Sequence, residues 1–379
     1  MPSTVYLDHA ATSYPKPPAV LSAVTDCMKR SGGNPGRSSH RLALAAAREI
    51  YACREIAAEL FGASPERVIF TLNTTHALNL AIKGILGRGG HAVCSDMEHN
   101  SVYRPLYRLS AEGIADFDVF DTYPNQAPST DRILSSLLAK IRPDTKMVVC
   151  AHASNVCSAT LPIAAMGSLC RRMGIRFVVD AAQSAGAVPL HVDRMNIDAL
   201  CLPGHKGLLG PMGTGMLILG EGLTLDTLLE GGNGMDSLRG EMGEDTPERL
   251  EAGTLQAPAI AGLREGMKFV KGVGVETIGA HERRLYVALR ERLSALPKVR
   301  LYAPKPVGSV LLFSVDGYSS EEVGHILDTE GICVRPGFHC SALGHKTLKT
   351  PSGGAVRVSL GYSSKEREVE AIWKVLKRL

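Results

Sequence analysis

The sequence of 379 residues lacks the features of several classes of protein. It has no run of basic residues and a formal net charge of only +4, so no electrostatic feature favours binding to nucleic acid. No apolar stretch approaches the ~20 residues that a membrane-spanning helix needs. Residues 1–8 contain neither the charged nor the apolar part of a signal peptide. We therefore expect a cytoplasmic protein that binds neither nucleic acid nor a membrane.

The cysteines also lack a pattern. There are nine, an odd number without regular spacing, which argues against a disulfide framework and favours a reducing compartment. Only His339, Cys340 and His345 stand close together as candidate metal ligands, and no second pair of cysteines with zinc-site spacing accompanies them. We expect no metal site.

The first 255 residues alternate between helical and strand-like patterns. Short runs that are apolar throughout predict strands buried on both faces, and the stretches between them repeat apolar residues at helical spacing. This alternation predicts an α/β fold with a mostly parallel sheet, in which ligands bind beyond the carboxyl ends of the strands. The expected strands are 68–71, 92–95, 147–151, 176–180 and 199–202, and the expected helices are 42–60, 77–86, 133–141 and 164–173.

After residue 258 the pattern changes, and length also favours two domains. We expect a large α/β domain that binds the cofactor over 15–255 and a smaller α+β domain over 256–379, with residues 1–14 packed against the latter. The expected elements of the smaller domain are a helical stretch over 260–296, strands at 309–314, 332–335 and 355–360, and a last helix at 365–379.

Lys206 stands in a glycine-rich turn (204–210) between two apolar runs. Burial of such a lysine lowers its pKa and leaves a neutral amine, which Schiff-base chemistry requires. For this motif alone, a surface lysine in a turn is the ordinary alternative. Asp180, at the end of an apolar strand and followed by Gln183, favours the reactive lysine over this alternative. Pyridoxal phosphate needs a carboxylate for its pyridinium nitrogen and a lysine for its aldehyde.

Two further motifs follow strand ends. Residues 73–75 (Asn-Thr-Thr) lie at a strand-to-helix junction, where free backbone N–H groups and hydroxyls form a phosphate cradle or simply cap the helix. His99 is either a structural histidine or an imidazole stacked on a flat cofactor. The glycine-rich segment 210–215 precedes a strand rather than opening a helix, so it indicates a turn and not a dinucleotide site.

Cys340 and Arg357 are the candidate residues of the smaller domain. Cys340 follows a strand, and its basic neighbours Arg335 and His339 are of the kind that makes a thiol reactive. Most of the other cysteines lie in apolar runs and are expected to be core residues. Arg357 lies within a strand, where it either faces solvent at a sheet edge or is buried against a planar anion such as a carboxylate.

Together these motifs resemble a known family. Nearly end to end, the chain is similar to class V aminotransferase-type, fold-type I pyridoxal phosphate enzymes, and within them to SufS-like (group II) cysteine desulfurases. Residues 335–340 (Arg-Pro-Gly-Phe-His-Cys) resemble desulfurases rather than plain aminotransferases. The other motifs that carry the resemblance are residues 6–12, 152–156, 180–183, 204–206, 251–254 and 356–360.

The resemblance implies a role for each candidate residue. Lys206 would bind the cofactor's aldehyde and shuttle the substrate's Cα proton, Cys340 would be the nucleophile, and His99 would stack on the ring and assist catalysis. Asp180 would contact the pyridine nitrogen of the cofactor and Gln183 its ring hydroxyl, and Asn155 is a further implied cofactor contact. The implied phosphate contacts are Thr74, Thr75 and His205, together with Thr254 from the partner subunit of a homodimer. The implied substrate contacts are Asn155 and Arg357, which would hold the carboxylate, and Arg335.

The reaction implied by the resemblance converts L-cysteine to L-alanine and leaves the sulfur on Cys340 as a persulfide. That persulfide needs a sulfur-acceptor protein or a thiol reductant, as in iron–sulfur cluster assembly. The alternatives within the fold are a lyase acting on L-selenocysteine, a cysteine-sulfinate lyase or an aminotransferase, and the non-enzymatic alternative is a scaffold without cofactor. The chain departs from the family pattern at Pro203, His76, Asn100 and Phe338.

Overall fold

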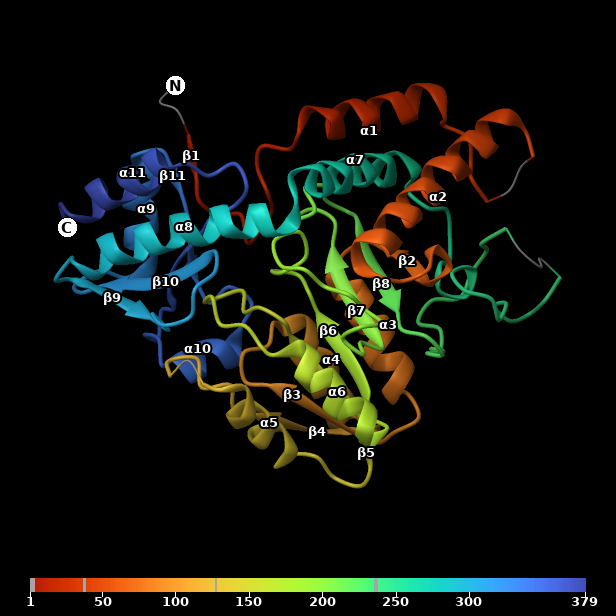
Figure 1. Ribbon diagram of the computed structural model, residues 1–379, viewed down its shortest axis with the longest axis horizontal. Coiled ribbons are helices and arrows are strands. Elements are labelled where there is room, and N and C mark those ends of the chain that lie inside the picture. Colours follow the sequence, from red (N-terminus) through yellow and green to blue (C-terminus); the bar gives the residue numbers. More distant parts are fainter. Residues whose placement is uncertain (1–3, 37–38, 127, 235–237) are drawn as a thin grey trace.

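The computed structural model describes residues 4–36, 39–126, 128–234 and 238–379. It shows a seven-stranded sheet between helices and, beside it, a smaller four-stranded sheet (Figure 1). The α/β fold predicted from the sequence is thereby confirmed. Residues 1–3, 37–38, 127 and 235–237 lie outside the described part. The first group belongs to the predicted N-terminal segment and the others to the predicted large domain.

The large sheet is mixed but mostly parallel. Strand β8 runs antiparallel to its neighbours β2 and β7, while the other neighbouring strands pair in parallel. In sheet order the strands are β2 (Val68–Thr71), β8 (Gly215–Leu219), β7 (Ala199–Pro203), β6 (Arg176–Asp180), β5 (Thr145–Ala151), β3 (His91–Ser95) and β4 (Asp116–Phe120).

Each face of this sheet packs against its own set of helices. Val148 and Cys150 of β5 belong to one hydrophobic core, whereas Met147 and Val149 belong to the other, as the two-residue period of a strand requires. The first core is shared with α2 (Arg41–Phe61), α5 (Thr130–Leu138), α6 (Ile163–Met173) and α7 (Ala257–Val273), and the second with α3 (Thr74–Leu86) and α4 (Asn100–Ala111).

The smaller sheet is antiparallel and lies next to the N-terminal segment. Strand β1 (Val5–Tyr6) pairs in parallel with β11 (Ile332–Cys333), so both ends of the chain lie on this part of the molecule (Figure 1). In sheet order the four strands are β12 (Arg335–Gly337), β13 (Ala355–Ser359), β10 (Val310–Val315) and β9 (Val299–Tyr302). The accompanying helices are α8 (Val275–Ser294), α9 (Ser320–Thr329), α10 (Ala342–Leu348) and α11 (Glu366–Leu376).

The structure corrects two predicted elements. The helical stretch 260–296 is two helices, α7 and α8, because Gly274 between them has a φ of 94°, outside the helical region. The predicted strand 332–335 is divided between β11 and β12, because the chain changes its pairing partner from β1 to β13. The sequence patterns did not predict β4, β9, α1 (Pro18–Arg30), α4, α9 or α10.

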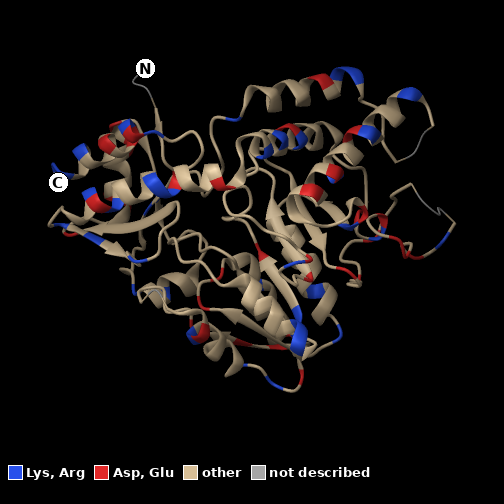
Figure 2. Ribbon diagram, viewed as in Figure 1, with Lys and Arg blue, Asp and Glu red and all other residues tan. Residues whose placement is uncertain are grey.

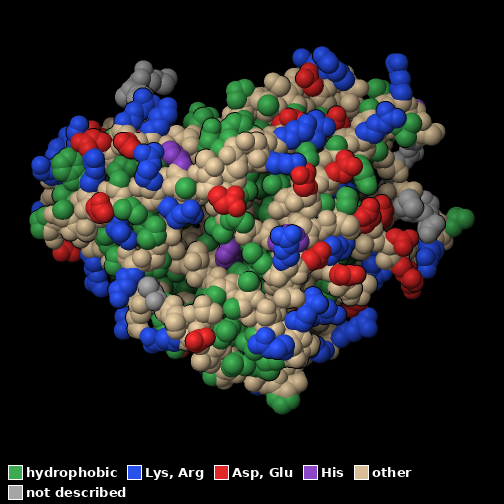
Figure 3. Space-filling model, in the orientation of Figure 1, with side chains coloured by type: hydrophobic (Ala, Val, Ile, Leu, Met, Phe, Trp, Pro, Cys, Tyr) green, Lys and Arg blue, Asp and Glu red, His purple; other side chains and the backbone are tan. Residues whose placement is uncertain are grey.

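Charges of both signs are mixed over the surface. Basic and acidic residues lie close together along the outer helices (Figure 2), and side chains of both signs are interspersed on the face drawn in Figure 3. This mixture agrees with the small net charge. Among the described helices, none has both the length and the apolar character needed to cross a bilayer.

A buried ion pair fixes the loop that precedes α7. The guanidinium of Arg54 donates from Nη2 to Oε2 of Glu251 at 2.6 Å, and both side chains are buried. The other carboxylate oxygen of Glu251 accepts the backbone N–H of Phe70 at 2.6 Å, while Arg54 also donates to the carbonyl of Val68. The segment that carries Thr254 is thus tied to α2 and β2.

We predict that Glu251→Ala lowers the free energy of unfolding by about 3–5 kcal/mol, because the substitution leaves Arg54 buried without its carboxylate. Urea unfolding at one fixed protein concentration measures the difference. The control Glu244→Ala, at an exposed position, should change the free energy by less than about 0.5 kcal/mol. A loss below about 1 kcal/mol in Glu251→Ala, as for a surface pair, would contradict the prediction.

Candidate active site

Lys206 lies in the turn between β7 and β8, beyond the carboxyl end of β7. The turn is closed by a backbone hydrogen bond from Gly204 N to Thr214 O, at 2.8 Å. It packs directly on the loop after β6, since a Cβ at Gly207 would lie 2.2 Å from the carbonyl oxygen of Ala185. A residue without a side chain is therefore required for this turn to approach the carboxyl end of β6.

Burial shifts the charged groups at these two strand ends toward their neutral forms. It lowers the pKa of Lys206 to about 8; Asp180 opposes this shift, and Arg357 and Arg335 add to it. Asp180 is 4% exposed, and burial raises its pKa against the opposing effects of the Ala182 N–H and of the lysine. The lysine can therefore lose its proton near neutral pH, as nucleophilic attack on an aldehyde requires.

One cavity brings together nearly all the residues predicted from the sequence. It lies at the carboxyl ends of the large sheet and is closed on the other side by residues of the smaller sheet. The predicted residues that line it are Thr74, Thr75, His99, Asn155, Asp180, Gln183, His205, Lys206, Arg335, Cys340 and Arg357. Thr254 is the exception.

Thr254 is exposed and lies in a different pocket, next to Arg54 and Glu251. Its hydroxyl accepts a hydrogen bond from the Asn34 amide at 3.3 Å. The ion pair described above holds this segment against α2, whose residues line the same pocket. Within the single chain, Thr254 thus contributes nothing to the cavity.

The first turn of α3 forms one end of the cavity. Asn73 caps this helix, because its side chain accepts the N–H of His76 at 3.0 Å. The cap and the phosphate cradle are compatible, since the N–H groups of Thr74 and Thr75 still lie at a helix N-terminus that favours anions. The hydroxyl of Thr75 is 2.7 Å from that of Ser101, a cavity residue that the sequence reasoning missed.

His99 and Gln183 also line the cavity. His99 caps α4, where its Nδ1 accepts the N–H of Ser101 at 3.0 Å, and burial lowers its pKa to about 4. The ring is therefore neutral at physiological pH and suited to stacking. Gln183 donates from Nε2 to the carbonyl of Ala10 at 3.1 Å, which fixes the orientation of its amide.

Arg357 also lines the cavity, and of the two alternatives predicted for this residue, the buried one is correct. It lies on β13, an inner strand of the smaller sheet, and is 2% exposed. Its guanidinium donates to Asp8 at 2.7 Å and to the carbonyl of Asn155 at 3.1 Å. Its Nε has no hydrogen-bond partner among the described residues. Arg335 of β12 is its register partner, so two arginines stand side by side.

Cys340 reaches the cavity on a short loop between β12 and α10. Its side chain is exposed, and its carbonyl accepts the N–H of Asn100 at 2.7 Å. The preceding carbonyl, of His339, accepts from the Asn155 amide at 2.7 Å, and the following hydroxyl, of Ser341, donates to the carbonyl of Glu98 at 3.0 Å. Three contacts with segments that follow β3 and β5 of the large sheet therefore hold the loop over the cavity.

Glu98 is a buried carboxyl that the sequence reasoning did not single out, although it stands beside His99 after a predicted strand. It accepts from the Ser95 hydroxyl and from Ala151 N, at 3.0 Å to the latter. Burial raises its pKa to about 8, and Asp180 adds to the shift. It thus joins the ends of β3 and β5 beneath the Cys340 loop.

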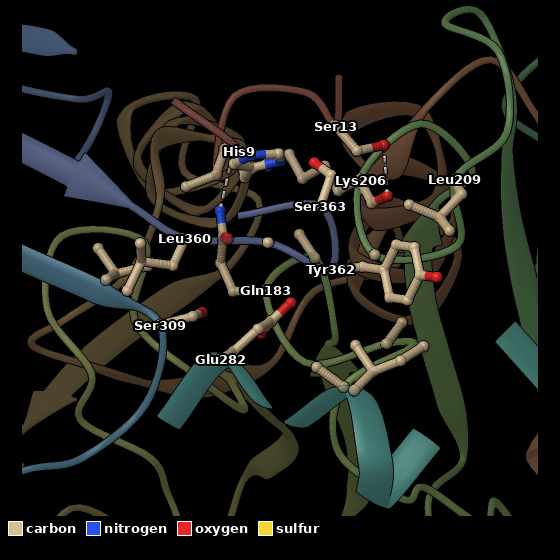
Figure 4. Close-up of a pocket in the computed structure, with 18 of the residues that line it drawn as sticks. His9, Ser13, Gln183, Lys206, Leu209, Glu282, Ser309, Leu360, Tyr362 and Ser363 are labelled. Carbon is tan, nitrogen blue, oxygen red and sulfur yellow. Dashed lines mark hydrogen bonds between the residues drawn. The ribbon is translucent and has the colours of Figure 1, made fainter. Parts of the chain in front are cut away.

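A second, smaller pocket shares Gln183 and Lys206 with the first (Figure 4). Glu282 of α8 points into it and is hydrogen-bonded to Ser309, and burial raises the pKa of this carboxyl to about 8. His9 of the N-terminal segment forms another wall. The pocket lies where the N-terminal segment, α8 and the Lys206 turn meet.

Comparison with known proteins agrees with this geometry. Residues 5–372 match the family described as Aminotransferase class-V. The chain belongs to this family. The resemblance predicted from the motifs is thus confirmed at the level of the class V family.

Other members of this family match nearly the whole length of the chain. A probable cysteine desulfurase of Methanothermobacter thermautotrophicus is 32% identical over 384 residues, covering 99% of this chain and 94% of the relative. One of Pyrococcus abyssi is 31% identical over 386 residues, with the same coverage. Among solved structures, a cysteine desulfurase of Thermococcus onnurineus NA1 has a TM-score of 0.89 at 30% identity, covering 99% of this chain and 94% of that one.

Enzymes of this family depend on pyridoxal phosphate, and the cavity residues fit that cofactor. Asp180 is a buried carboxyl for the pyridinium nitrogen, and Lys206 supplies an amine of lowered pKa for the aldehyde. At the α3 end, His205 Nδ1 is buried without a partner among the described residues, so a phosphate oxygen can satisfy it. Pro203, two residues before His205, has no hydroxyl with which to bind the phosphate.

We predict that in enzyme freed of cofactor, the reactivity of the Lys206 amine rises as pH increases through about 8, because the neutral fraction grows there. The amine of an ordinary lysine reaches the same neutral fraction only at about pH 10.4. Reductive methylation at a series of pH values, followed by mass spectrometry of peptides, measures this profile. The exposed Lys29 provides the internal reference, and identical profiles for the two lysines would contradict the prediction.

Proposed function

We propose that the protein is a pyridoxal phosphate-dependent cysteine desulfurase that converts L-cysteine to L-alanine and receives the sulfur on Cys340. The observation that carries this proposal is an exposed thiol, that of Cys340, lining the same cavity as Lys206, Asp180 and Arg357. The relatives named as cysteine desulfurases support it. The segment 335–340 favours the SufS-like (group II) branch within that activity.

The arginine end of the cavity would bind the substrate carboxylate. Arg357 has a buried Nε available, and the guanidinium plane suits a carboxylate. Asp8 and the Asn155 carbonyl already hold its two other nitrogens, so the orientation of the fork is set before substrate arrives. Arg335 adds a second positive charge beside it.

Lys206 would hold and move the proton at the substrate's Cα, since its pKa near 8 lets it both accept and donate at neutral pH. Bound pyridoxal phosphate supplies an electron sink that withdraws density from that carbon. His99, neutral and partly buried, covers the ring position and excludes water from it.

Cys340 would then take the sulfur. Its thiolate attacks the substrate sulfur, an S–S bond forms, and the bond from that sulfur to Cβ breaks. The electron pair of the broken bond stays with the carbon skeleton, which takes up protons and leaves as alanine. L-Cysteine and the thiol of Cys340 thus give L-alanine and a persulfide, without an external oxidant or reductant.

The persulfide requires an acceptor, a sulfur-carrier protein or a thiol reductant, which can reach Cys340 because this side chain is exposed. Delivery for iron–sulfur cluster assembly is part of the same proposal. All nine cysteines are described and are free thiols, seven of them buried, which supports a reducing, cytoplasmic location.

We predict that Cys340→Ser keeps the visible absorbance of the bound cofactor but lowers alanine release from L-cysteine to below about 1% of wild type, because the sulfur has no acceptor. The wild-type peptide that contains Cys340 should gain the mass of one sulfur atom. Amino-acid analysis and peptide mass spectrometry provide the two measurements.

Cys333→Ser, which removes a partly buried thiol of the same domain, is the matched control and should retain activity. Full activity of Cys340→Ser would overturn the desulfurase proposal. Alanine or pyruvate formed without the mass gain would instead assign a lyase or an aminotransferase, and turnover of L-selenocysteine or cysteine sulfinate alone would assign the corresponding lyase.

We further propose that two copies of the chain form a dimer in which Thr254 reaches the phosphate of the partner's site. Thr254 is exposed and lines a pocket other than the one that contains Lys206, which supports this arrangement. The Arg54–Glu251 pair would hold the donor segment rigidly for that contact.

We predict that Thr254→Ala weakens cofactor binding about tenfold, the loss expected for one hydrogen bond to a charged group. In mixed dimers of Thr254→Ala and Lys206→Ala subunits, one of the two sites then combines a native Lys206 with a native Thr254. At a cofactor concentration that leaves Thr254→Ala largely unloaded, activity well above that of either parent should therefore appear on mixing. Its absence in dimers proven to be mixed by mass spectrometry would contradict contribution in trans.

A further inference from the structure

A continuous chain of hydrogen bonds lies behind Cys340 and involves two buried histidines. His339 Nε2 is 2.8 Å from the carbonyl oxygen of Arg335, and His339 Nδ1 is 3.0 Å from His345 Nε2. The chain continues from His345 Nδ1 to the Thr350 hydroxyl at 2.8 Å. The planes of the two imidazoles are nearly parallel, 16° apart, and both residues are buried, at 4% and 3% exposure.

The chemistry of the partners fixes the direction of this chain. A carbonyl only accepts, so His339 must carry its proton on Nε2. Burial lowers the pKa of His339 to about 3 and that of His345 to about 4, and the nearby Arg357 adds to both shifts, so both rings are neutral. His339 Nδ1 therefore accepts from the Nε2–H of His345, whose Nδ1 in turn accepts from the Thr350 hydroxyl.

The backbone that this chain supports is strained. His339 and Cys340 have φ values of 52° and 55°, so two consecutive residues with side chains occupy the left-handed region. Such residues persist only where the surroundings determine their conformation. The carbonyls of both are held by Asn155 and by the backbone N–H of Asn100, but the His339 side chain is held by Arg335 and His345.

We propose that His345 is a positioning residue for the Cys340 thiol, and that Thr350 supports it. By donating to His339, His345 locks the imidazole against β12 and so maintains the left-handed pair that turns Cys340 toward the cavity. The inference deepens the proposed function, since it gives the sulfur-accepting loop its rigidity. Phe338, whose ring meets His345 edge-on at 5.3 Å, closes the outer side of the pair.

The first test compares His345→Leu, which removes the donor, with His345→Gln, whose amide Nε2 can donate to His339 in place of the ring. Hydrogen–deuterium exchange of the peptide containing residues 339–341 is measured on the cofactor-loaded enzyme, which reports the loop without turnover. We expect exchange to rise at least about tenfold in His345→Leu and to return within about threefold of wild type in His345→Gln. His325→Leu, an exposed histidine of α9, is the control and should not change it.

The second readout is the steady-state release of alanine from L-cysteine. In His345→Leu, kcat should fall at least about tenfold while KM stays within about twofold, because the Arg357 end that binds the carboxylate is untouched. His345→Gln should recover most of kcat. Hydrogen–deuterium exchange at the wild-type rate in His345→Leu would overturn the positioning role. Equal losses of kcat in His345→Leu and His345→Gln would also overturn it.

Thr350→Val provides an independent test should His345→Leu fail to fold. It removes only the hydroxyl that donates to His345, and we expect exchange of residues 339–341 to rise about threefold. Thr347→Val, the same change on α10, should leave exchange as in wild type, and equal exchange in both variants would overturn the inference. If the wild-type enzyme releases no alanine, the proposed function fails on its own, and the exchange results still decide the positioning role.

Discussion

The close contact between two backbone turns is the constraint on which the site depends. The Lys206 turn and the loop after β6 touch through glycines on both sides, since a Cβ at Gly186 would lie 2.3 Å from the carbonyl oxygen of Gly207. This approach puts Lys206 and Asp180 in one buried space, where each shifts the pKa of the other toward retention of its charge and burial opposes both. A larger side chain at either glycine would separate them.

The second half of the site is brought by the smaller sheet and the N-terminal segment. Arg357 lies on an inner strand because Asp8 gives it a partly buried carboxylate, and Asp8 is placed there by its bridge to Ser359 of the same strand. Cys340 follows β12, the strand that pairs with β13. The position of the thiol and of the arginine is therefore set by one sheet, while Lys206 and Asp180 are set by the other.

The part of the site that follows the strands of the large sheet was predictable because it consists of polar residues at the ends of apolar runs. Asp180, Lys206 and the residues before α3 all carry that local signal. The pairing of Asp8 with Arg357 was not predictable, since 349 residues separate the two and no local pattern links them. His345 appeared in the sequence only as a weak metal candidate, because a spacing of six residues does not reveal that α10 returns its ring to His339.

The distribution of charge explains why so many histidines serve this site without carrying charge. Lys206, Arg335 and Arg357 line a cavity whose described carboxylate is Asp180, so its field favours anions such as a phosphate and a substrate carboxylate. Burial lowers the pKa of His99, of His205 and of His339 to about 4, 4 and 3, and nearby cations, among them Lys206 for the first two and Arg357 for His339, add to the shifts. A neutral imidazole both donates and accepts, whereas a protonated one only donates. The positive cavity thereby maintains the acceptor nitrogens on which the His339–His345 hydrogen bond and the cap of α4 depend.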